Sequence, residues 1–269
     1  MTDTGEYFGN ADQIPLMHRG RNLWELMQDN PAYSFYGRMV SLCDPEDDAI
    51  NKMLSLARLQ GAASCQYYPI DQADGFCSEL EALGMNAGRY EQCRGEKAAI
   101  ESSRRILDEY QLPEDISVVV LDQSSSTKLV REVADVSLAC GVMPVPGSVM
   151  RGTGRKGVCL AAVDDAGKVV ATASSYLSNH PDGTRAKDAF WGMLATGEAR
   201  RGERIGLILG AQSIVWMSEN LGARSFNTGI TADNASSMAL CEKLGVIPSK
   251  WTFIACIDPE AMKNGSVTR

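Results

Sequence analysis

The chain has 269 residues, of which 44% are hydrophobic and 22% are charged, and its net charge is −8. This length suffices for one complete domain plus a smaller additional unit. The negative charge argues against nonspecific nucleic-acid binding, which requires an excess of Lys and Arg, and it suits a cationic amine substrate. No apolar run approaches the ~20 residues of a membrane-spanning helix, so we expect no membrane embedding.

The amino-terminal stretch 1–20 has no periodic apolar pattern, and it lacks the basic flank and apolar segment of a secretory signal. We therefore expect irregular structure there and a cytoplasmic protein. Eight cysteines are scattered without a Cys-x-x-Cys pair, and the chain has only two histidines. This pattern predicts reduced thiols and no metal site.

The first half of the chain alternates predicted helices and strands. Apolar periodicity and turn residues predict helices at 44–62, 76–85 and 96–112, and strands at 64–70 and 87–93. After Pro113 the pattern predicts a buried strand at 116–122, an amphipathic helix at 126–141, a hairpin at 157–177 and a strand at 187–198. Gly167 can adopt the positive φ that the hairpin turn requires.

The stretch 199–212, ARRGERIGLILGAQ, places three arginines and a glycine before an apolar helix that we expect to begin near Glu203 or Arg204. Unpaired backbone N–H groups at the positive end of a helix dipole form an anion site, and pyrophosphate is the natural ligand. The alternative is a plain strand-to-helix turn with solvated arginines. A strand and a helix follow at 228–246, with Asp233 or Asn234 as the N-cap and Gly245 as the stop.

These two motifs, R-G-x-x-I-G before a helix and D-N-x-x-x-x-x-L-x-x-x-L-G-V after it, resemble those of the GNAT superfamily of acyl-CoA-dependent N-acyltransferases. The resemblance covers residues 114–258. It implies an α/β fold with a mixed central sheet flanked by helices, and acetyl-CoA as the co-substrate.

The resemblance also assigns cofactor-binding residues. The loop that wraps the CoA pyrophosphate with its amides corresponds to Arg201, Gly202, Glu203, Arg204, Ile205 and Gly206. The strand residues Leu194, Ala195 and Thr196 would part from the neighbouring strand and bind the pantetheine arm. Asn234 corresponds to an asparagine near the pantetheine end, and it also fits a plain helix N-cap.

Two positions depart from the family pattern. Arg204 replaces the middle glycine of the loop; we expect ordinary helical angles there and a side chain that swings away to add a contact, rather than crowding the phosphates. Cys241 stands where many members have the tyrosine that protonates the departing thiolate. It is therefore either the general acid or a plain buried cysteine.

No general base is fixed by the sequence. Glu198, just after the reacting strand, is the candidate that we pair with Cys241 as catalytic. Asp188, Tyr176 and His180 lie on or near the same strands and remain alternatives. Members of this family often deprotonate the amine through ordered water, with orientation and backbone contacts contributing much of the catalysis.

The region 1–112 resembles a partial, degenerate copy of the GNAT-like domain at 113–269. The Gly-Ala and Leu-Gly pairs at 61–62 and 83–84 are spaced like those at 222–223 and 244–245, and SFYG at 34–37 is similar to AFWG at 189–192. The acidic stretch CDPEDD at 43–48 replaces the basic loop and would repel pyrophosphate. Coincidence between two αβ units is the alternative; a true repeat would pack against the catalytic domain or shape the acceptor pocket.

The sequence therefore predicts an N-acetyltransferase that transfers an acetyl group from acetyl-CoA to a primary amine of a small molecule or peptide. The alternative is a non-catalytic acyl-CoA-binding regulatory protein. The sequence does not identify the acceptor or fix the oligomeric state, although a homodimer is compatible with it.

Overall fold

The computed structural model describes residues 5–263, and the strands in this part of the chain form one ten-stranded sheet. The order across the sheet is β1-β2-β3-β10-β4-β9-β8-β7-β6-β5. The strands are β1 (Tyr33–Phe35), β2 (Val40–Leu42), β3 (Ala62–Pro69), β4 (Asn86–Gly95), β5 (Ile116–Val120), β6 (Gly157–Asp164), β7 (Val169–Leu177), β8 (Asp188–Thr196), β9 (Ser225–Ile230) and β10 (Ile247–Ile257). Parallel pairs β2–β3 and β8–β9 stand among antiparallel neighbours, which confirms the expected mixed sheet.

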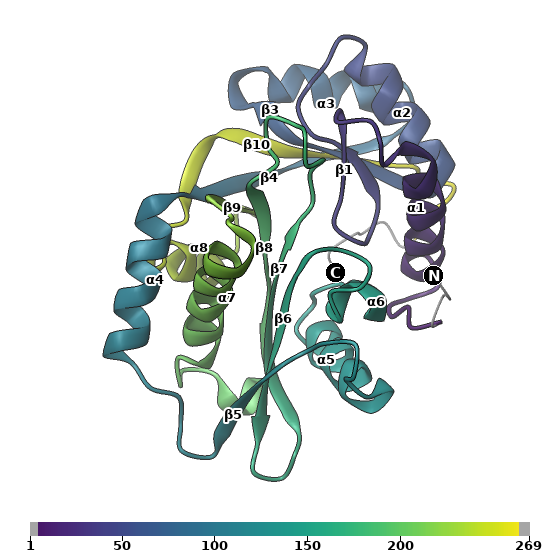
Figure 1. Ribbon diagram of the computed structural model, residues 1–269. Helices are drawn as coiled ribbons and strands as arrows, with labels where there is room; N and C mark the ends of the chain where they lie inside the picture. The colour runs from purple at the N-terminus through teal and green to yellow at the C-terminus, as the bar shows by residue number, and fades with distance from the viewer. Residues whose placement is uncertain (1–4, 264–269) are drawn as a thin grey trace.

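Helices cover both faces of this sheet (Figure 1). They are α1 (Gln13–Met27), α2 (Ala49–Gln60), α3 (Ala73–Ala82), α4 (Lys97–Glu109), α5 (Thr127–Ala139), α6 (Gly147–Met150), α7 (Ile205–Leu221) and α8 (Ala235–Lys243), with short 3₁₀ turns at Ile70–Gln72 and Glu198–Arg200. In the β5–β9 half, α7 and α4 lie on one face, and α5 and α6 lie on the other. The α2 helix packs on β2 and β3, and α3 packs on β4 and β10.

The two halves of the chain exchange their last strands. The units α2–β3–α3–β4 and α7–β9–α8–β10 have the same order of elements. However, β10 pairs with β3 and β4 pairs with β9, both antiparallel, so each unit's last strand lies beside the other unit's middle strand. The single sheet therefore runs across the connection between α4 and β5, where we proposed the boundary at 112/113.

The two units also match at the start of their first helices. Asp48 before α2 and Arg204 before α7 are both N-cap residues with left-handed backbone angles, at φ 64° and φ 61°. In each unit the strand that precedes this helix, β2 or β8, pairs in parallel with the middle strand. SFYG at 34–37 lies at β1 and the following loop, one strand earlier than the counterpart of β8, so the proposed equivalence of SFYG with AFWG was wrong.

Several expected elements are confirmed. Ser126 caps α5, whose buried face includes Val130 and Val133, and Gly167 takes φ 76° in the hairpin turn. Two expectations were wrong. The stretch expected to be irregular contains the start of α1, where Leu16 and Met17 are fully buried. The 116–122 strand, predicted to be buried, lies at the sheet edge, and Val120 is 45% exposed. The prediction failed because an apolar run does not reveal whether one or both faces of a strand are covered.

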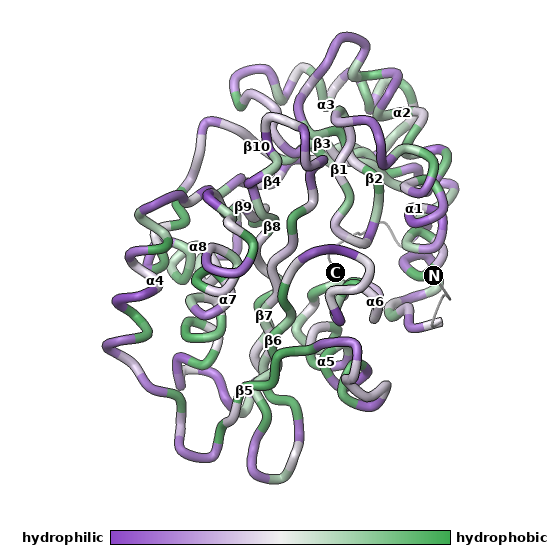
Figure 2. The backbone as a smooth tube through the Cα atoms, viewed as in Figure 1, coloured by the Kyte–Doolittle hydropathy of each residue, from purple (hydrophilic) through white to green (hydrophobic). Residues whose placement is uncertain are grey.

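Hydrophobic segments concentrate along the strands and the sheet-facing sides of the helices, and hydrophilic ones lie in turns and on outer helix surfaces (Figure 2). Two core clusters occupy the faces of the β5–β9 half. Trp191 and Phe226 belong to the cluster on the α7 face, whereas Phe190 and Met193 belong to that on the α5 face. Over residues 5–263, the helices are all too short or too polar to cross a bilayer.

Candidate active site

The neighbouring strands β8 and β9 part half-way along their length. Their parallel pairing runs from Asp188↔Ser225 to Phe190↔Asn227 and then stops, although β8 continues to Thr196. The register of β8 with β7 shifts in the same region, where Met193 has a left-handed φ of 50°. This bulge turns the backbone of β8, and the edge that faces β9 has no strand partner beyond Phe190. The expected parting of these strands is therefore present.

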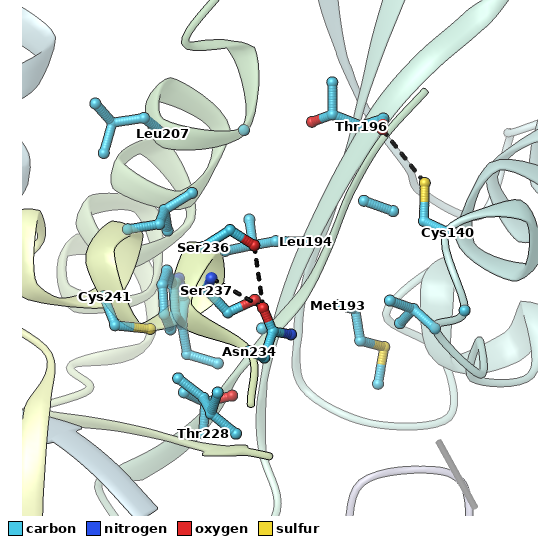
Figure 3. A pocket seen from close by; sticks show the side chains of 18 of the residues that line it. Cys140, Met193, Leu194, Thr196, Leu207, Thr228, Asn234, Ser236, Ser237 and Cys241 are labelled. Carbon is cyan, nitrogen blue, oxygen red and sulfur yellow. Dashed lines mark hydrogen bonds between the residues drawn. The ribbon is translucent and has the colours of Figure 1, made fainter. Parts of the chain in front are cut away.

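A cavity of about 870 Å³ occupies this gap and passes between the two faces of the sheet. On the α7 face it reaches the first turn of α7, and on the α5 face it reaches the loops around Arg38 and Met143. Figure 3 shows side chains from β8, α7, α8 and the segment after α5 gathered around it. Within residues 5–263, no aspartate or glutamate lines it, and five cationic residues do: Arg38, Arg200, Arg201, Arg204 and Lys243.

The loop at the α7 end has a different conformation from the one we expected. α7 begins at Ile205, and Arg204 is its N-cap with left-handed angles, φ 61° and ψ 9°, not an ordinary helical residue. Glycine adopts this conformation without strain, which explains why the related motif has glycine there. The first helical bond runs from Ile208 N to Arg204 O, so the amides of residues 205–207 have no acceptor within the helix. They form the expected array at the positive helix end.

The three arginines of the loop have different partners. Arg200 forms ion pairs with Asp115 and Glu203, with N–O distances of 2.7 and 2.8 Å. Glu203 therefore turns away from the cavity, which it does not line. The guanidinium of Arg204 lies 4.8 Å from the ring centre of Tyr110, so this side chain does swing away. Arg201 is exposed and donates a hydrogen bond to the Thr196 carbonyl at 3.3 Å.

Comparison with known proteins identifies this arrangement. Residues 147–246, which include β8, the loop, α7 and α8, match the family model described as the acetyltransferase (GNAT) family. The chain carries a GNAT domain. Its match spans both motifs, and GNAT proteins are in general acyltransferases that use acyl-CoA and act on amines.

Solved structures show the GNAT fold across most of the chain. A GCN5-related N-acetyltransferase from Kribbella flavida is similar with a TM-score of 0.59 and 15% identity, over 91% of this chain and 96% of that one. A GCN5-related N-acetyltransferase-like protein from Streptococcus suis has a TM-score of 0.53 and 18% identity, over 84% and 82%. A tandem GNAT protein from the clavulanic acid biosynthesis pathway has a TM-score of 0.50 and 18% identity, over 78% and 68%. No curated protein matches the chain in sequence.

The expected pantetheine residues lie along the gap. Leu194, Ala195 and Thr196 all line the cavity, as does Asn234. The Asn234 side chain caps α8 by accepting hydrogen bonds from Ser237 N and Ser236 Oγ, both at 3.1 Å. In Figure 3 its amide nitrogen points away from these serines. The N-cap reading is thus confirmed, and cofactor contact by the same residue stays a prediction.

Cys241 lines the cavity from α8, but its thiol is poorly suited to give up a proton. The side chain is buried beside Cys93 of β4. The Cys93 thiol and burial raise the pKa of Cys241 well above its ordinary value. Transfer of its proton to a thiolate of ordinary pKa, ~8.5, would be uphill.

We predict that Cys241→Ala lowers kcat by less than about tenfold. Loss of a true general acid costs ~10²–10⁴-fold, whereas Ala at this position removes only packing. Steady-state kinetics at saturating acetyl-CoA, with any amine that supports turnover, measure the change. A loss of two or more orders of magnitude, with the alkaline limb of the pH profile shifted, would restore the role of general acid to Cys241.

The expected general bases do not meet in the cavity. Glu198 is exposed on the short turn after β8 and does not line it, and neither do Asp188, Tyr176 or His180. Asp188 is buried, and its carboxylate accepts a hydrogen bond from Tyr67 and forms an ion pair with Arg94. Tyr176 is fully buried. The general base therefore stays unassigned. Within residues 5–263, no three potential ligands gather as a metal site.

The sequence reasoning missed Arg38 and Met143, which close the cavity on the α5 face. Arg38 follows β1 in the amino-terminal half, and Met143 follows α5, so neither is near the motifs in sequence. No local pattern marks them, because the topology alone brings the β1–β2 loop to this opening.

The left-handed Arg204 gives a stability prediction for the loop. Arg204→Gly relieves backbone strain of about 1–2 kcal/mol and removes a cation–π contact worth about 0.5–1 kcal/mol, so the free energy of unfolding should change by less than about 1.5 kcal/mol. Arg204→Val retains the strain and loses the contact, and it should destabilise the protein. Urea unfolding compares the two; a glycine variant less stable than the valine variant would contradict the left-handed assignment.

Proposed function

We propose that this protein is an N-acetyltransferase that transfers the acetyl group of acetyl-CoA to a primary amine. The observation that carries the proposal is the single cavity that joins the parted edge of β8 to the free amides of α7. A GNAT domain is present, and this cavity has the charge and the backbone donors that an acyl-CoA requires.

In the proposed complex, the amides of 205–207 and the loop at 201–204 bind the pyrophosphate, with Arg201 adding a charge. The unpaired edge of β8 binds the pantetheine arm as an added strand would, and Asn234 contacts it from α8. Gly206 gives the phosphates close access, since a Cβ at this position would already lie 3.1 Å from Thr196 Oγ1.

The reaction would occur where β8 and β9 part. The amine nitrogen attacks the thioester carbonyl, the carbon–sulfur bond breaks, and an amide and a thiol are released. A backbone N–H of β8 near Leu194 would stabilise the oxyanion, at the place where the Met193 bulge redirects the strand. The acceptor would enter from the α5 face, opposite the pyrophosphate.

The alternative function is acyl-CoA binding without turnover. It is favoured by one observation: within residues 5–263 no aspartate or glutamate lines the cavity, and Cys93 and burial raise the pKa of Cys241. Loss of general acid or base catalysis slows acyl transfer, but the rate acceleration that comes from orienting the amine and the thioester remains. We therefore prefer the acetyltransferase function to binding without turnover.

Release of free CoA thiol tests the proposal. The protein is incubated with acetyl-CoA and a panel of primary amines that covers amino acids, alkylamines, polyamines and short peptides. Amine-dependent thiol release, with the acetylated product seen by mass spectrometry, is expected for at least one class. Acetyl-CoA binding without release of CoA thiol on any amine would support the regulatory alternative.

We further propose that the protein acts in the cytoplasm, since its eight cysteines, all within the described residues, are free thiols.

A further inference from the structure

Arg38 is a buried cation without a counter-charge. It is 5% exposed and lies in the loop between β1 and β2. Within residues 5–263 its only hydrogen bond is donated by Nη2 to the carbonyl of Met143, its Nε has no partner, and no carboxylate lies within ion-pairing distance. An arginine has five N–H donors, so most of its capacity is unused.

This arrangement is costly unless a ligand completes it. Leaving a buried charge unpaired destabilises a protein by several kcal/mol in general, and buried arginines are therefore normally paired with carboxylates. Other arginines of this chain follow that rule. Arg151 pairs with Glu6, and Arg94 pairs with Asp188. In the described part of the chain Arg38 has no carboxylate partner, and unlike Arg155, a less buried arginine that also lacks one, it lines the cavity.

The surroundings of Arg38 are aromatic and largely apolar. Tyr36 stacks on Phe190 with ring centres 4.3 Å apart, and the guanidinium of Arg38 lies 5.6 Å from the Tyr36 ring centre. Phe190, Met143 and Met193 line the same part of the cavity. A guanidinium in surroundings of low dielectric constant binds a carboxylate strongly and specifically, because its planar N–H donors match the two carboxylate oxygens.

The charge of the cavity limits the acceptor further. The chain carries a net charge of −8, yet within residues 5–263 the Arg and Lys residues that line this cavity are not accompanied by any aspartate or glutamate. An acceptor with several positive charges, such as a polyamine, would be repelled, contrary to what the net charge alone indicates. Arg38 lies at the α5 face, whereas the loop arginines lie at the other end, so the two ends would bind two separate anions.

We propose that the acceptor is an amine that also carries a carboxylate, of the amino-acid class, and that Arg38 binds this carboxylate. The proposal rests on the proposed acetyltransferase function. The carboxylate on Arg38 would direct the amine toward the parting of β8 and β9, where the thioester carbonyl is expected. The amino-terminal half of the chain would thereby supply a specificity-determining residue to the catalytic half.

Matched pairs of acceptors test this proposal. Glycine, leucine and phenylalanine are compared with methylamine, isopentylamine and 2-phenylethylamine, which lack only the carboxylate. At least one amino acid should have a kcat/KM about 100-fold above that of its partner amine, as expected for a charge-assisted contact. Arg38→Met should abolish this difference by lowering turnover of the amino acid, with little effect on the amine or on the Kd for acetyl-CoA.

Two variants serve as controls. Arg38→Lys keeps the charge without the planar fork and should retain part of the preference. Arg104→Gln removes an exposed arginine that pairs with Glu219 at the surface and should change neither acceptor nor cofactor binding. Since Arg38 is unpaired, Arg38→Met should not lower the thermal midpoint, which separates a ligand-binding role from a structural one.

Binding measurements distinguish failure of this inference from failure of the proposed function. The same amino acids are titrated calorimetrically into the protein with CoA present. Amino-acid binding that Arg38→Met removes supports the inference even if no amine is acetylated, which would contradict only the enzyme. Equal use of both members of every pair, or no amino-acid binding and no amino-acid turnover, would overturn the inference.

Discussion

Gly206→Glu should abolish the binding of acetyl-CoA. Gly206 lies in the first turn of α7, at the mouth of the cavity, and a Cβ there would stand 3.1 Å from Thr196 Oγ1. A glutamate would cover the amides of this turn and place a negative charge where the pyrophosphate is expected. In a thermal-shift experiment, acetyl-CoA at about 100 times its Kd should raise the midpoint of the wild type by about 5 °C or more and leave the variant unchanged.

Folding of this variant should be intact, because an acidic residue in the first turn of a helix interacts favourably with the helix dipole. Asn220→Glu is the matched control. It adds the same charge to an exposed position at the other end of α7 and should bind acetyl-CoA like the wild type. An unchanged thermal shift in Gly206→Glu would show that the cofactor does not bind at this loop.

Asp188→Asn should lower the free energy of unfolding by about 1–3 kcal/mol, because it removes a buried carboxylate that accepts charge-assisted hydrogen bonds from partly buried arginines. The Asp188 carboxylate accepts a hydrogen bond from Tyr67 at 3.0 Å and lies 3.2 Å from Arg94 Nη2. Arg185, 3.8 Å away, stacks on the Tyr67 ring. These contacts join β3 and β4 to the first residue of β8, so they hold the two halves of the sheet together. Chemical denaturation measures the change.

The same variant also tests whether Asp188 is catalytic. Since the carboxylate does not line the cavity, kcat of the folded variant should remain within about threefold, far from the ~10²–10⁴-fold loss expected for a general base. Asp182→Asn, an equal charge change at an exposed position nearby, should alter stability by less than about 0.5 kcal/mol. Full stability of Asp188→Asn with a large loss of kcat would assign the base role to Asp188.

The position of the α7 loop in the chain and the hairpin at 157–177 were predictable because their signals are local, whereas the conformation of Arg204 in that loop was not. Gly167 in the turn and the N-cap of α5 at Ser126 depend on residues within one turn of the chain. The position of the loop before α7 likewise follows from glycines and arginines that directly precede an apolar helix. Such features are fixed by backbone angles and capping hydrogen bonds, which sequence reports directly.

The remaining features depend on long-range packing. The exchange of β4 and β10 leaves the order of elements unchanged, so no sequence pattern reveals which strand each one joins. The left-handed angles of Met193 and Arg204 are held by surrounding structure against the preference of their residue types. Arg38 reaches the cavity only because the β1–β2 loop extends to the other half of the molecule.

The measurement that tests the account most directly is calorimetric titration of the wild-type protein with acetyl-CoA and, separately, with acetyl-pantetheine. We predict that acetyl-CoA binds with a Kd in the micromolar range and that acetyl-pantetheine, which lacks the pyrophosphate, binds at least about 100-fold more weakly. No binding of acetyl-CoA, or equal affinity for the two ligands, would contradict an acyl-CoA site that places the pyrophosphate on the first turn of α7.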